Sequence, residues 1–448
     1  MNKLNPVTLA KQKKQAYSFF QNKQLSEAKA LLTEICKIDR RDADMWNMLA
    51  AVHGMLEEYV EAEQCARKVL ELQPTSDGAY NNLANALKSQ GKLAQAEASY
   101  RRALQLQPNN ANAYNNLAGL LRALSKIEEA QACYVRALQL KPDYVEACFS
   151  LGILLQQQHK TDEAQVYFQQ VIQMKPDHVK ALLLLGSIFR EKGAVKDAET
   201  LFNRALQINP ESEETHYHLA ILGVGEMPAQ PPSEHVKQLF DGYAENFDEH
   251  LIGQLHYRAP ELLYNLLSPM LHKKGEGLDV LDLGCGTGLC GPLFRDVASH
   301  LVGVDLSPGM LDKARKRNIY DDLLLGDVTL ALSASIAAYD LVVSTDVFIY
   351  FGDLQRVFEL VYAALRPGGM FAFSTESAEH VDQYELRVSG RYAHAAEYIS
   401  RLARGVALDE VSVKTVELRH EFGKPVMGNI FVLRKPQSRD VHIPMLFG

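Results

Sequence analysis

The sequence predicts an α-helical repeat solenoid followed by an α/β domain with a mostly parallel sheet. A period of 34 residues runs through the first half of the chain. A stretch rich in proline and glycine follows, and after it short apolar runs alternate with amphipathic segments. The chain has 448 residues, of which 47% are apolar and 23% charged, so it has enough apolar material for packed domains.

The 34-residue period is carried by several residue types at once. A proline recurs at one position, an alanine lies twelve residues before it, and a leucine followed by a small residue marks a third position. Each repeat is therefore predicted to form two amphipathic helices that cross closely at the small residues and end at the proline. The three series are Pro74, Pro108, Pro142, Pro176 and Pro210; Ala62, Ala96, Ala130, Ala164 and Ala198; and Leu49, Leu83, Leu117, Leu151 and Leu185.

This pattern resembles the tetratricopeptide (TPR) repeat, a helix–turn–helix unit of 34 residues. The resemblance implies six repeats and a capping helix over residues 9–222, stacked as a solenoid with a concave groove. The first repeat, about residues 9–42, keeps small residues at Ala16 and Ala28 but has Arg40 where the later repeats have proline.

Polar side chains on the first helices of neighbouring repeats are candidates for binding a protein or peptide. Asn82, Asn85 and Asn116 each offer a donor and an acceptor to an extended peptide backbone. This arrangement is similar to the inner face of TPR solenoids such as that of O-GlcNAc transferase. Lys88 and Arg122 share one repeat position and could face an acidic partner. The alternative interpretation is that these residues only solvate an exposed face.

The chain changes period after a linker predicted at residues 223–235. Short apolar runs that alternate with amphipathic segments favour βαβ units and a parallel sheet. Residues 411–420 and 426–434 are predicted to form an antiparallel pair at the end of the domain. The apolar runs predicted as the preceding strands are residues 278–283, 300–305, 322–325, 339–344 and 370–374.

A glycine-rich loop follows the first of these strands. Gly284, Gly286 and Gly288 let the backbone approach a ligand closely between a strand and a helix N-terminus. Asp305 ends the next strand, where a carboxylate can accept hydrogen bonds from ribose hydroxyls. The loop has the spacing G-x-G-x-G, which differs from the G-x-G-x-x-G fingerprint of dinucleotide-binding proteins.

The segments LDLGCGTG and GVDLSPGMLDKAR resemble motif I and its sequel in class I S-adenosylmethionine-dependent methyltransferases. The segments GDV, YDLVVSTDVFIYF and LRPGGMFAFSTE follow in that family's order. The resemblance covers residues 236–435 and implies a Rossmann-like domain with a seven-stranded sheet and S-adenosylmethionine as the cofactor. With the repeats before it, the chain is similar to a bacterial group of TPR–methyltransferase fusions. The residues that the resemblance assigns to the cofactor are Asp282, Gly284, Cys285, Gly286, Gly288, Asp305, Met310, Asp327 and Val328.

Methyl transfer is an in-line displacement at the sulfonium carbon, so the enzyme mainly aligns the nucleophile and excludes water. The resemblance places Asp346 and Tyr350 where this superfamily often contacts substrate, and His250 in an N-terminal lid. The family's signature for amide or amine methylation is absent, which disfavours adenine or glutamine as the acceptor. The reaction needs no metal, and no metal ligands are predicted.

Three interpretations of function stay open. The solenoid captures a protein or peptide and presents it as the methyl acceptor, or the enzyme methylates a small molecule while the repeats dock a partner protein. In the third, the chain is a scaffold that binds S-adenosylmethionine without turnover. The methyl acceptor, its accepting atom, any general base and the oligomeric state are not predicted.

The charge balance and the hydropathy of the chain limit which classes of partner are expected. The formal charge is −8, and 30 of the 55 acidic residues but only 21 of the 47 basic ones follow residue 222. A nucleic-acid substrate is therefore not expected. No signal peptide and no run of about 18 apolar residues is present, which predicts a cytoplasmic protein without a membrane partner. The six cysteines are too scattered to predict a disulfide framework or a zinc site.

Overall fold

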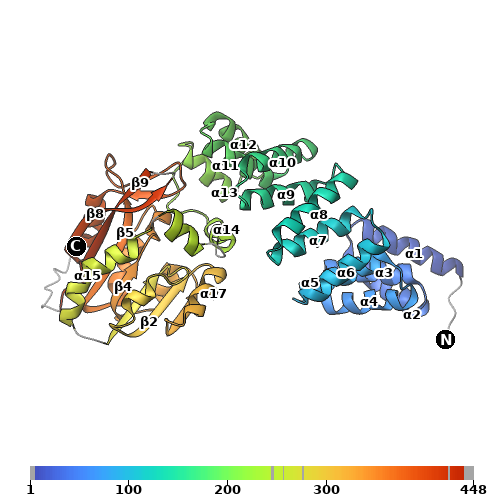
Figure 1. The fold of residues 1–448 in the computed structure, drawn as a ribbon, viewed down its shortest axis with the longest axis horizontal. Helices are drawn as coiled ribbons and strands as arrows, with labels where there is room; N and C mark the ends of the chain where they lie inside the picture. The colour runs from blue at the N-terminus through green and yellow to red at the C-terminus, as the bar shows by residue number, and fades with distance from the viewer. Residues whose placement is uncertain (1–5, 244–246, 256, 275–276, 422–423, 438–448) are drawn as a thin grey trace, which may run out of the picture. The chain divides into compact units, whose positions relative to one another are not determined.

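The computed structural model describes residues 6–243, 247–255, 257–274, 277–421 and 424–437. The chain divides into two compact units, Met1–Ala194 and Val195–Gly448. Over its described residues the first unit consists of helices and their connections, and the second holds the sheet (Figure 1).

The first unit is a series of helix pairs, as the 34-residue period predicts. The first helix of several pairs begins after a capping side chain, since Asp42, Ser76 and Asn110 each accept a hydrogen bond from the N–H three residues on. The helices are α1 (Pro6–Gln21), α2 (Leu25–Ile38), α3 (Ala43–Met55), α4 (Tyr59–Leu72), α5 (Asp77–Ser89), α6 (Leu93–Leu106), α7 (Ala111–Ala123), α8 (Ile127–Leu140), α9 (Val145–Gln157), α10 (Thr161–Met174) and α11 (Val179–Glu191).

The small residues of the repeat lie at the close helix contacts. Ala62 and Ala96, for example, are at most 2% exposed. Gly152 in α9 is the tightest case, because an added Cβ atom would lie 2.7 Å from a ring carbon of the fully buried Phe168. The small residue after each repeated leucine therefore has a packing role at this position.

Gly152→Ala is expected to destabilise the first unit by about 1–3 kcal/mol, because the new methyl group overpacks against Phe168. Gly54→Ala in α3 is the matched control, since its added Cβ meets nothing within 4 Å. Alanine is favoured over glycine in a helix by about 1 kcal/mol, so this control should be neutral or stabilising. Urea unfolding followed by circular dichroism measures both changes, and equal effects would contradict the packing explanation.

The second unit begins before the predicted linker. Its first elements are α12 (Val195–Ile208) and α13 (Glu213–Ile221), which the sequence assigns to the repeats. The Tyr217 hydroxyl of α13 donates a hydrogen bond to the Gly390 carbonyl, and the Tyr392 hydroxyl donates to the Pro228 carbonyl at 2.6 Å. Residues 223–235 are thus bonded to the sheet domain, and the division between the compact units does not fall within them.

The described sheet of the second unit has nine strands. Parallel strands in the order β3-β2-β1-β4-β5 form its main part, and the antiparallel strands β9 and β8 continue it beyond β5. The five parallel strands together with β8 and β9 are the seven that the sequence predicts. Strands β6 and β7 add a short ladder at the end of β5. The strands are β1 (Leu278–Leu283), β2 (Ala298–Asp305), β3 (Asp322–Leu325), β4 (Tyr339–Ser344), β5 (Leu365–Ser377), β6 (Tyr384–Leu386), β7 (Tyr392–His394), β8 (Asp409–Glu421) and β9 (Lys424–Arg434).

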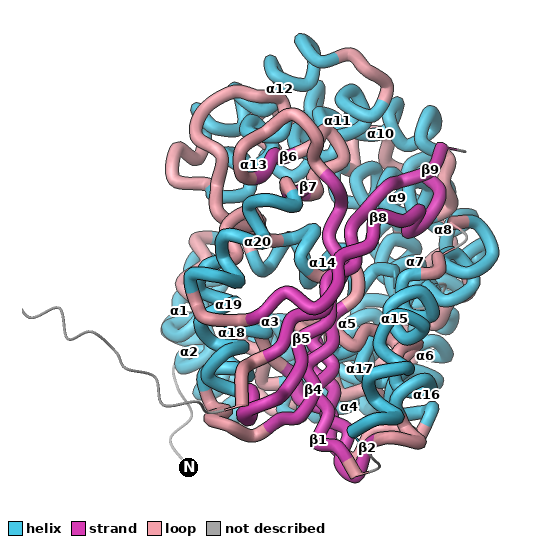
Figure 2. The backbone as a smooth tube through the Cα atoms, turned by 90° about the vertical axis from the view of Figure 1, so that its left-hand side faces the viewer, coloured by secondary structure: helices cyan, strands magenta, loops and turns pink. Residues whose placement is uncertain are grey.

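Helices cover both faces of this sheet (Figure 2). One apolar core lies under α15 and α16, and a second lies under α18, α19 and α20. Parallel strands buried on both faces are nearly continuous apolar runs, which is why they are visible in the sequence. No helix of the described residues is long and apolar enough to cross a bilayer. The remaining elements are α14 (Ser233–Tyr243), η2 (Glu249–Gln254), α15 (Ala259–Lys274), α16 (Gly291–Phe294), α17 (Pro308–Arg317), α18 (Val328–Ser333), η3 (Phe348–Tyr350), α19 (Gln355–Ala364) and α20 (Ala396–Gly405).

Candidate active site

The glycine loop lies at the carboxyl end of β1. Gly284, Gly286 and Gly288 have φ angles of 67°, 54° and 86°, a backbone region that favours glycine. A Cβ atom at Gly284 would lie 2.2 Å from a methyl group of Val347, so packing also requires glycine there. At Gly286 the nearest described atom to an added Cβ is a ring carbon of Phe247, 3.9 Å away. The backbone at Gly286 therefore leaves room for the close approach of a ligand.

Asp305 borders the loop from the end of β2. One carboxylate oxygen accepts a hydrogen bond from the Gly286 N–H at 2.9 Å, and the other accepts from the Ser307 N–H at 2.9 Å. Burial raises the pKa of Asp305, and hydrogen bonds from the backbone lower it. An ionised carboxylate has about four acceptor positions, so Asp305 can hold the loop and still accept hydrogen bonds from a ligand.

Asp282 lies behind the loop on β1 and is 1% exposed. Its carboxylate accepts a hydrogen bond from the Tyr320 hydroxyl at 2.6 Å. Burial raises the pKa of Asp282 to about 7, the hydrogen bond from Tyr320 lowers it, and the charge of Asp305 raises it further. Tyr320 also packs against Gly291, where an added Cβ would lie 2.9 Å from its ring. The sequence contains no motif that singles out Tyr320.

Asp282 is expected to make the second unit less stable as the pH rises. Its pKa is near 3.8 in the unfolded chain and about 7 in the folded one, so its contribution is fully present below pH 3.8 and is lost as the pH rises through 7. Asp282→Asn should flatten this part of the profile of unfolding temperature against pH. Asp279→Asn on the same strand, whose carboxylate pairs with Arg366 at 2.7 Å, is the control. An unchanged slope in Asp282→Asn would contradict the assignment.

The other predicted cofactor residues lie near the same edge of the sheet and are largely buried. Cys285 is 6% exposed, Met310 1% and Val328 7%, and Val328 belongs to an apolar core. Asp327 caps α18, because its Oδ1 accepts a hydrogen bond from the Thr329 N–H at 2.7 Å. A ligand amino group would therefore have to use the other oxygen of Asp327. Cofactor contacts by these four residues stay predictions.

Helix α14 contacts two segments beside the glycine loop. The Ser307 hydroxyl donates a hydrogen bond to Asp241 of α14 at 2.5 Å. The ring of Phe240 packs edge-on against that of Tyr350, with the ring centroids 5.4 Å apart. Helix α14 thus contacts both the segment after β2 and a predicted catalytic residue.

The segment after α14 holds the glycine loop directly. Asp248 accepts hydrogen bonds from the Thr287 hydroxyl and from the Arg317 guanidinium. His250, predicted as a catalytic lid residue, belongs to η2, but its side chain lies outside the described residues. Its role therefore stays a prediction.

Asp346 follows β4 with a φ of 55° and takes part in a buried ionic network. The Arg419 guanidinium, whose side chain is 2% exposed, donates to Asp346 at 2.6 Å and to Glu376. Glu376 is 3% exposed and also pairs with Arg387 at 3.1 Å. The Asp346 N–H donates to the Ser374 hydroxyl at 2.9 Å. A proton transfer to Asp346 would break its ion pair with Arg419.

Two partly buried tyrosines border this network. Burial raises the pKa of Tyr350. The positive charge of Arg391 and the hydrogen bond between Arg391 and Tyr350 lower the pKa of Tyr350. Arg391 itself pairs with Glu421. Burial and then the charge of Asp346 raise the pKa of Tyr257. Both phenols are therefore neutral donors at physiological pH, suited to hydrogen-bonding an anionic or carbonyl oxygen.

Comparisons with known proteins match two regions of the chain. Residues 280–369 match the methyltransferase domain family, and residues 80–207 match the middle TPR-like domain of cilia and flagella-associated protein 70. The chain thus carries a TPR-like region followed by a region of the methyltransferase domain family, the arrangement of a TPR–methyltransferase fusion. The methyltransferase domain family implies S-adenosylmethionine as the methyl donor.

Several curated proteins are similar in sequence to part of the methyltransferase domain of this chain. Malonyl-[acyl-carrier protein] O-methyltransferase of Serratia marcescens is 38% identical over 102 residues, which are 23% of this chain and 40% of that protein. The 18S rRNA (guanine(1575)-N(7))-methyltransferase of Saccharomyces cerevisiae is 30% identical over 148 residues, 30% of this chain and 50% of that protein. The chain spans about half the length of the curated relatives it matches. A solved structure of PilF from Pseudomonas aeruginosa aligns with a TM-score of 0.42 and 20% identity, over 47% of this chain and 96% of that chain.

In the repeat region of the fusion, three predicted peptide-binding residues line one cavity. Asn82, Asn85 and Lys88 lie on α5 and face a hollow of about 380 Å³ that α3 and α4 also line. Burial lowers the pKa of Lys88, and the charge of Arg122 lowers it further. Asn116 and Arg122 lie on α7 and are not among the residues that line this cavity.

The asparagines of the repeat region also bond to one another. Asn82 donates from its amide to the Asn47 side-chain oxygen at 2.9 Å, and Asn116 donates to Asn81 at 3.1 Å. Part of their hydrogen-bonding capacity is thus used between neighbouring repeats. Binding of a peptide by these residues stays a prediction.

Proposed function

We propose that this chain is an S-adenosylmethionine-dependent methyltransferase whose repeat region binds a protein that carries the methyl acceptor. The observation that supports cofactor binding is the open backbone at Gly286 beside the carboxylate of Asp305. A binding scaffold without turnover would not need a second cluster of buried polar groups around Asp346 and Tyr350.

The residues present fit this cofactor. Asp305 would accept hydrogen bonds from the ribose hydroxyls, and the backbone at Gly286 would lie against the amino-acid portion. Asp282 and Tyr320 would support the loop from behind, since their mutual hydrogen bond is buried. When bound, S-adenosylmethionine supplies an electrophilic methyl group on a positively charged sulfur. The protein's tasks are then to align the acceptor with that methyl group and to exclude water.

The acceptor that the site favours is a carboxylate oxygen. Such an oxygen is already ionised at neutral pH, so its methylation needs no general base. Asp346 is engaged by Arg419, which makes it a poor candidate for proton removal. Arg391 and the Tyr350 hydroxyl could instead hold the second oxygen of an acceptor carboxylate through a charge-assisted hydrogen bond.

The relatives support the same class of acceptor. Several are named malonyl-[acyl-carrier protein] O-methyltransferases, so their acceptor is attached to a protein. A small acyl group delivered on a protein combines the two enzymatic interpretations of the sequence, because the repeats would bind the carrier and the methyltransferase domain would act on the acyl group. The acidic balance after residue 222 disfavours an RNA acceptor.

The test is the transfer of tritium-labelled methyl groups by the full chain to three acceptors: malonyl-acyl-carrier protein, a free malonyl thioester, and the carrier without malonate. We expect base-labile label on the first, with kcat/KM about 100-fold above that of the free thioester, because carrier docking raises the local acceptor concentration. Equal kcat/KM for both thioesters would contradict a docking role. Label on the bare carrier would identify a side-chain acceptor, and no label with cofactor bound would indicate a scaffold.

Lys88→Ala tests the docking surface separately. It should lower methylation of the carrier-bound substrate by at least about tenfold and leave that of the free thioester unchanged, because loss of one hydrogen bond to a charged group costs about 1.5–3 kcal/mol. Lys92→Ala is the control, since Lys92 is 43% exposed and pairs with Glu63 at 2.9 Å. Equal responses of the two lysine variants would contradict the proposed surface.

A further inference from the structure

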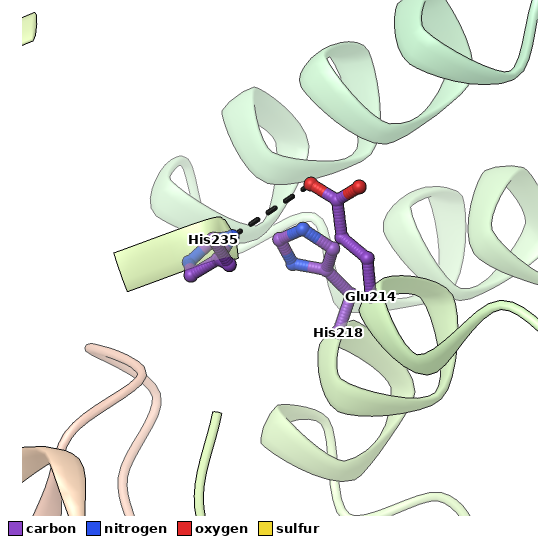
Figure 3. A group of neighbouring side chains, drawn as sticks. All are labelled: Glu214, His218 and His235. Atoms are coloured by element: carbon purple, nitrogen blue, oxygen red, sulfur yellow. Dashed lines mark ion pairs between the residues drawn. The ribbon is translucent and has the colours of Figure 1, made fainter. Parts of the chain in front are cut away.

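Three metal-ligating side chains meet at the junction of α13 and α14. Glu214 and His218 lie one helical turn apart on α13 and therefore share a face. His235 lies near the start of α14, and Figure 3 shows the ring of His218 between the other two side chains. One ligand atom from each residue lies within 4.8 Å of the others.

The surroundings hold these side chains in place. His218 is 5% exposed, and its ring stacks on Phe202 with the centroids 4.9 Å apart. The rings of His218 and His235 are 5.5 Å apart and nearly perpendicular, so neither covers the other. The His235 ring also contacts that of Tyr217 at 5.3 Å. Packed aromatic neighbours of this kind restrict the rotamers of ligating histidines.

The spacing suits a bridging ion better than a direct hydrogen bond. The Glu214 carboxylate and His235 Nδ1 are 3.7 Å apart, which is longer than a hydrogen bond. Nitrogen and oxygen ligands at about 2.1 Å from a tetrahedral ion are about 3.4 Å from one another. The three donors would therefore need only small rotations to share one ion, with water in the fourth position.

We propose that Glu214, His218 and His235 bind one divalent transition-metal ion of zinc-like chemistry. Two imidazoles and one carboxylate are a typical ligand set for such an ion. The sequence alone predicts no metal here, because His235 lies beyond the proline-rich segment and the fold brings it to α13. The site is separate from the methyl-transfer chemistry and does not depend on the proposed acceptor.

The ion clamps α14 to α13. The other end of α14 carries Phe240 and Asp241, which contact Tyr350 and Ser307 beside the candidate active site. The role of the metal is thus to hold the helix that contacts Ser307 and Tyr350 beside the candidate active site. Glu214 and His235 are partly exposed, so an ion can reach the site from solvent.

The test uses the full chain, treated with a chelator, dialysed and titrated with Co²⁺ or Zn²⁺ alone. We expect one ion per chain and a cobalt d–d spectrum without a thiolate charge-transfer band. His235→Gln and Glu214→Gln should each weaken metal binding at least about tenfold. Loss of a residue that only hydrogen-bonds to a metal ligand already costs about that much affinity, so loss of a ligand should cost no less. His216→Gln on the same helix is the control, because His216 is exposed and bonds to the Pro210 carbonyl at 2.9 Å.

Each other outcome overturns the proposal. Binding that is unchanged in both variants, or a thiolate band from any of the six cysteines, would place the ion elsewhere. If the chain binds no ion in the titration, the three residues form only an ion pair. Hydrogen exchange tests the clamp itself: Zn²⁺ should slow exchange in α14 of the wild type and not in His235→Gln, and equal rates with and without Zn²⁺ would refute the clamp. These readouts do not depend on methyltransferase activity.

Discussion

Asp305→Ala is expected to weaken S-adenosylmethionine binding about 100-fold. A hydrogen bond to a charged group contributes about 1.5–3 kcal/mol, so loss of the contacts to two ribose hydroxyls readily reaches the 2.7 kcal/mol that corresponds to this factor. Titration calorimetry on the full chain measures the change. The residual affinity would come from the backbone at Gly286 and from the remaining cofactor contacts.

Asp312→Ala is the matched control for Asp305. Asp312 lies on the neighbouring helix α17, is 67% exposed and pairs with Arg315, so its loss should leave cofactor affinity unchanged. Asp305 also bonds to the backbone of Gly286 and Ser307, and thermal unfolding of both variants therefore checks that the loop is intact. Equal cofactor affinity in Asp305→Ala and Asp312→Ala would refute the assignment.

Arg419→Met is expected to lower the free energy of unfolding of the second unit by about 3–5 kcal/mol. The substitution keeps most of the side-chain volume but leaves Asp346 and Glu376 buried without their shared cation, which is the costly way to break a buried ion pair. Denaturant unfolding followed by tyrosine fluorescence measures the change. Arg419→Met combined with Glu376→Gln should recover part of the loss, because a buried carboxylate that keeps only its pair with Arg387 is then neutralised.

Arg404→Met shows what an exposed pair contributes in the same unit. Arg404 and Glu397 are 67% and 68% exposed, so this substitution should change the free energy of unfolding by at most about 1 kcal/mol. If Arg419→Met lowers the free energy of unfolding no more than Arg404→Met does, the buried network does not stabilise the fold around Asp346.

The ionic network also bears on the acceptor. In this network, arginines form ion pairs with Asp346 and Glu376, and the Tyr350 hydroxyl lies beside Arg391. A site of this kind stabilises an anionic group through charge-assisted hydrogen bonds more readily than it removes a proton. This is the physical basis on which we propose a carboxylate acceptor in preference to an alcohol or an amine.

Much of the architecture is predictable because its signals are local. The repeat period follows from the packing of neighbouring helices, and the structure confirms the helix pairs from α1 through α10 and the helix α11 that follows them. The strands β1, β3 and β4 have the predicted bounds. Strands β1 and β4 are largely buried and therefore form continuous apolar runs, while β3 is mostly exposed and is still marked by its three leucines. The short strands β6 and β7 were not predicted, since three partly polar residues carry no such pattern.

The contacts around the candidate site were less predictable. Arg419 reaches Asp346 only because β8 follows β9 in the sheet, and the two residues are 73 positions apart in the chain. Tyr320 reaches Asp282 across 38 positions from a loop without a motif. The assignment of α12 and α13 to the second unit likewise depends on distant contacts such as that of Tyr217 with Gly390.

The sequence by itself determined the helical repeats, the parallel α/β domain and the glycine loop with Asp305, because each depends on residues that are close in the chain. Only the tertiary structure decided which charges are buried together, what supports Asp282, where the compact units divide, and that Glu214, His218 and His235 meet. The physical reason is that a partner for a buried charge or a ligating histidine is chosen by strand order and helix docking, which leave no period in the sequence.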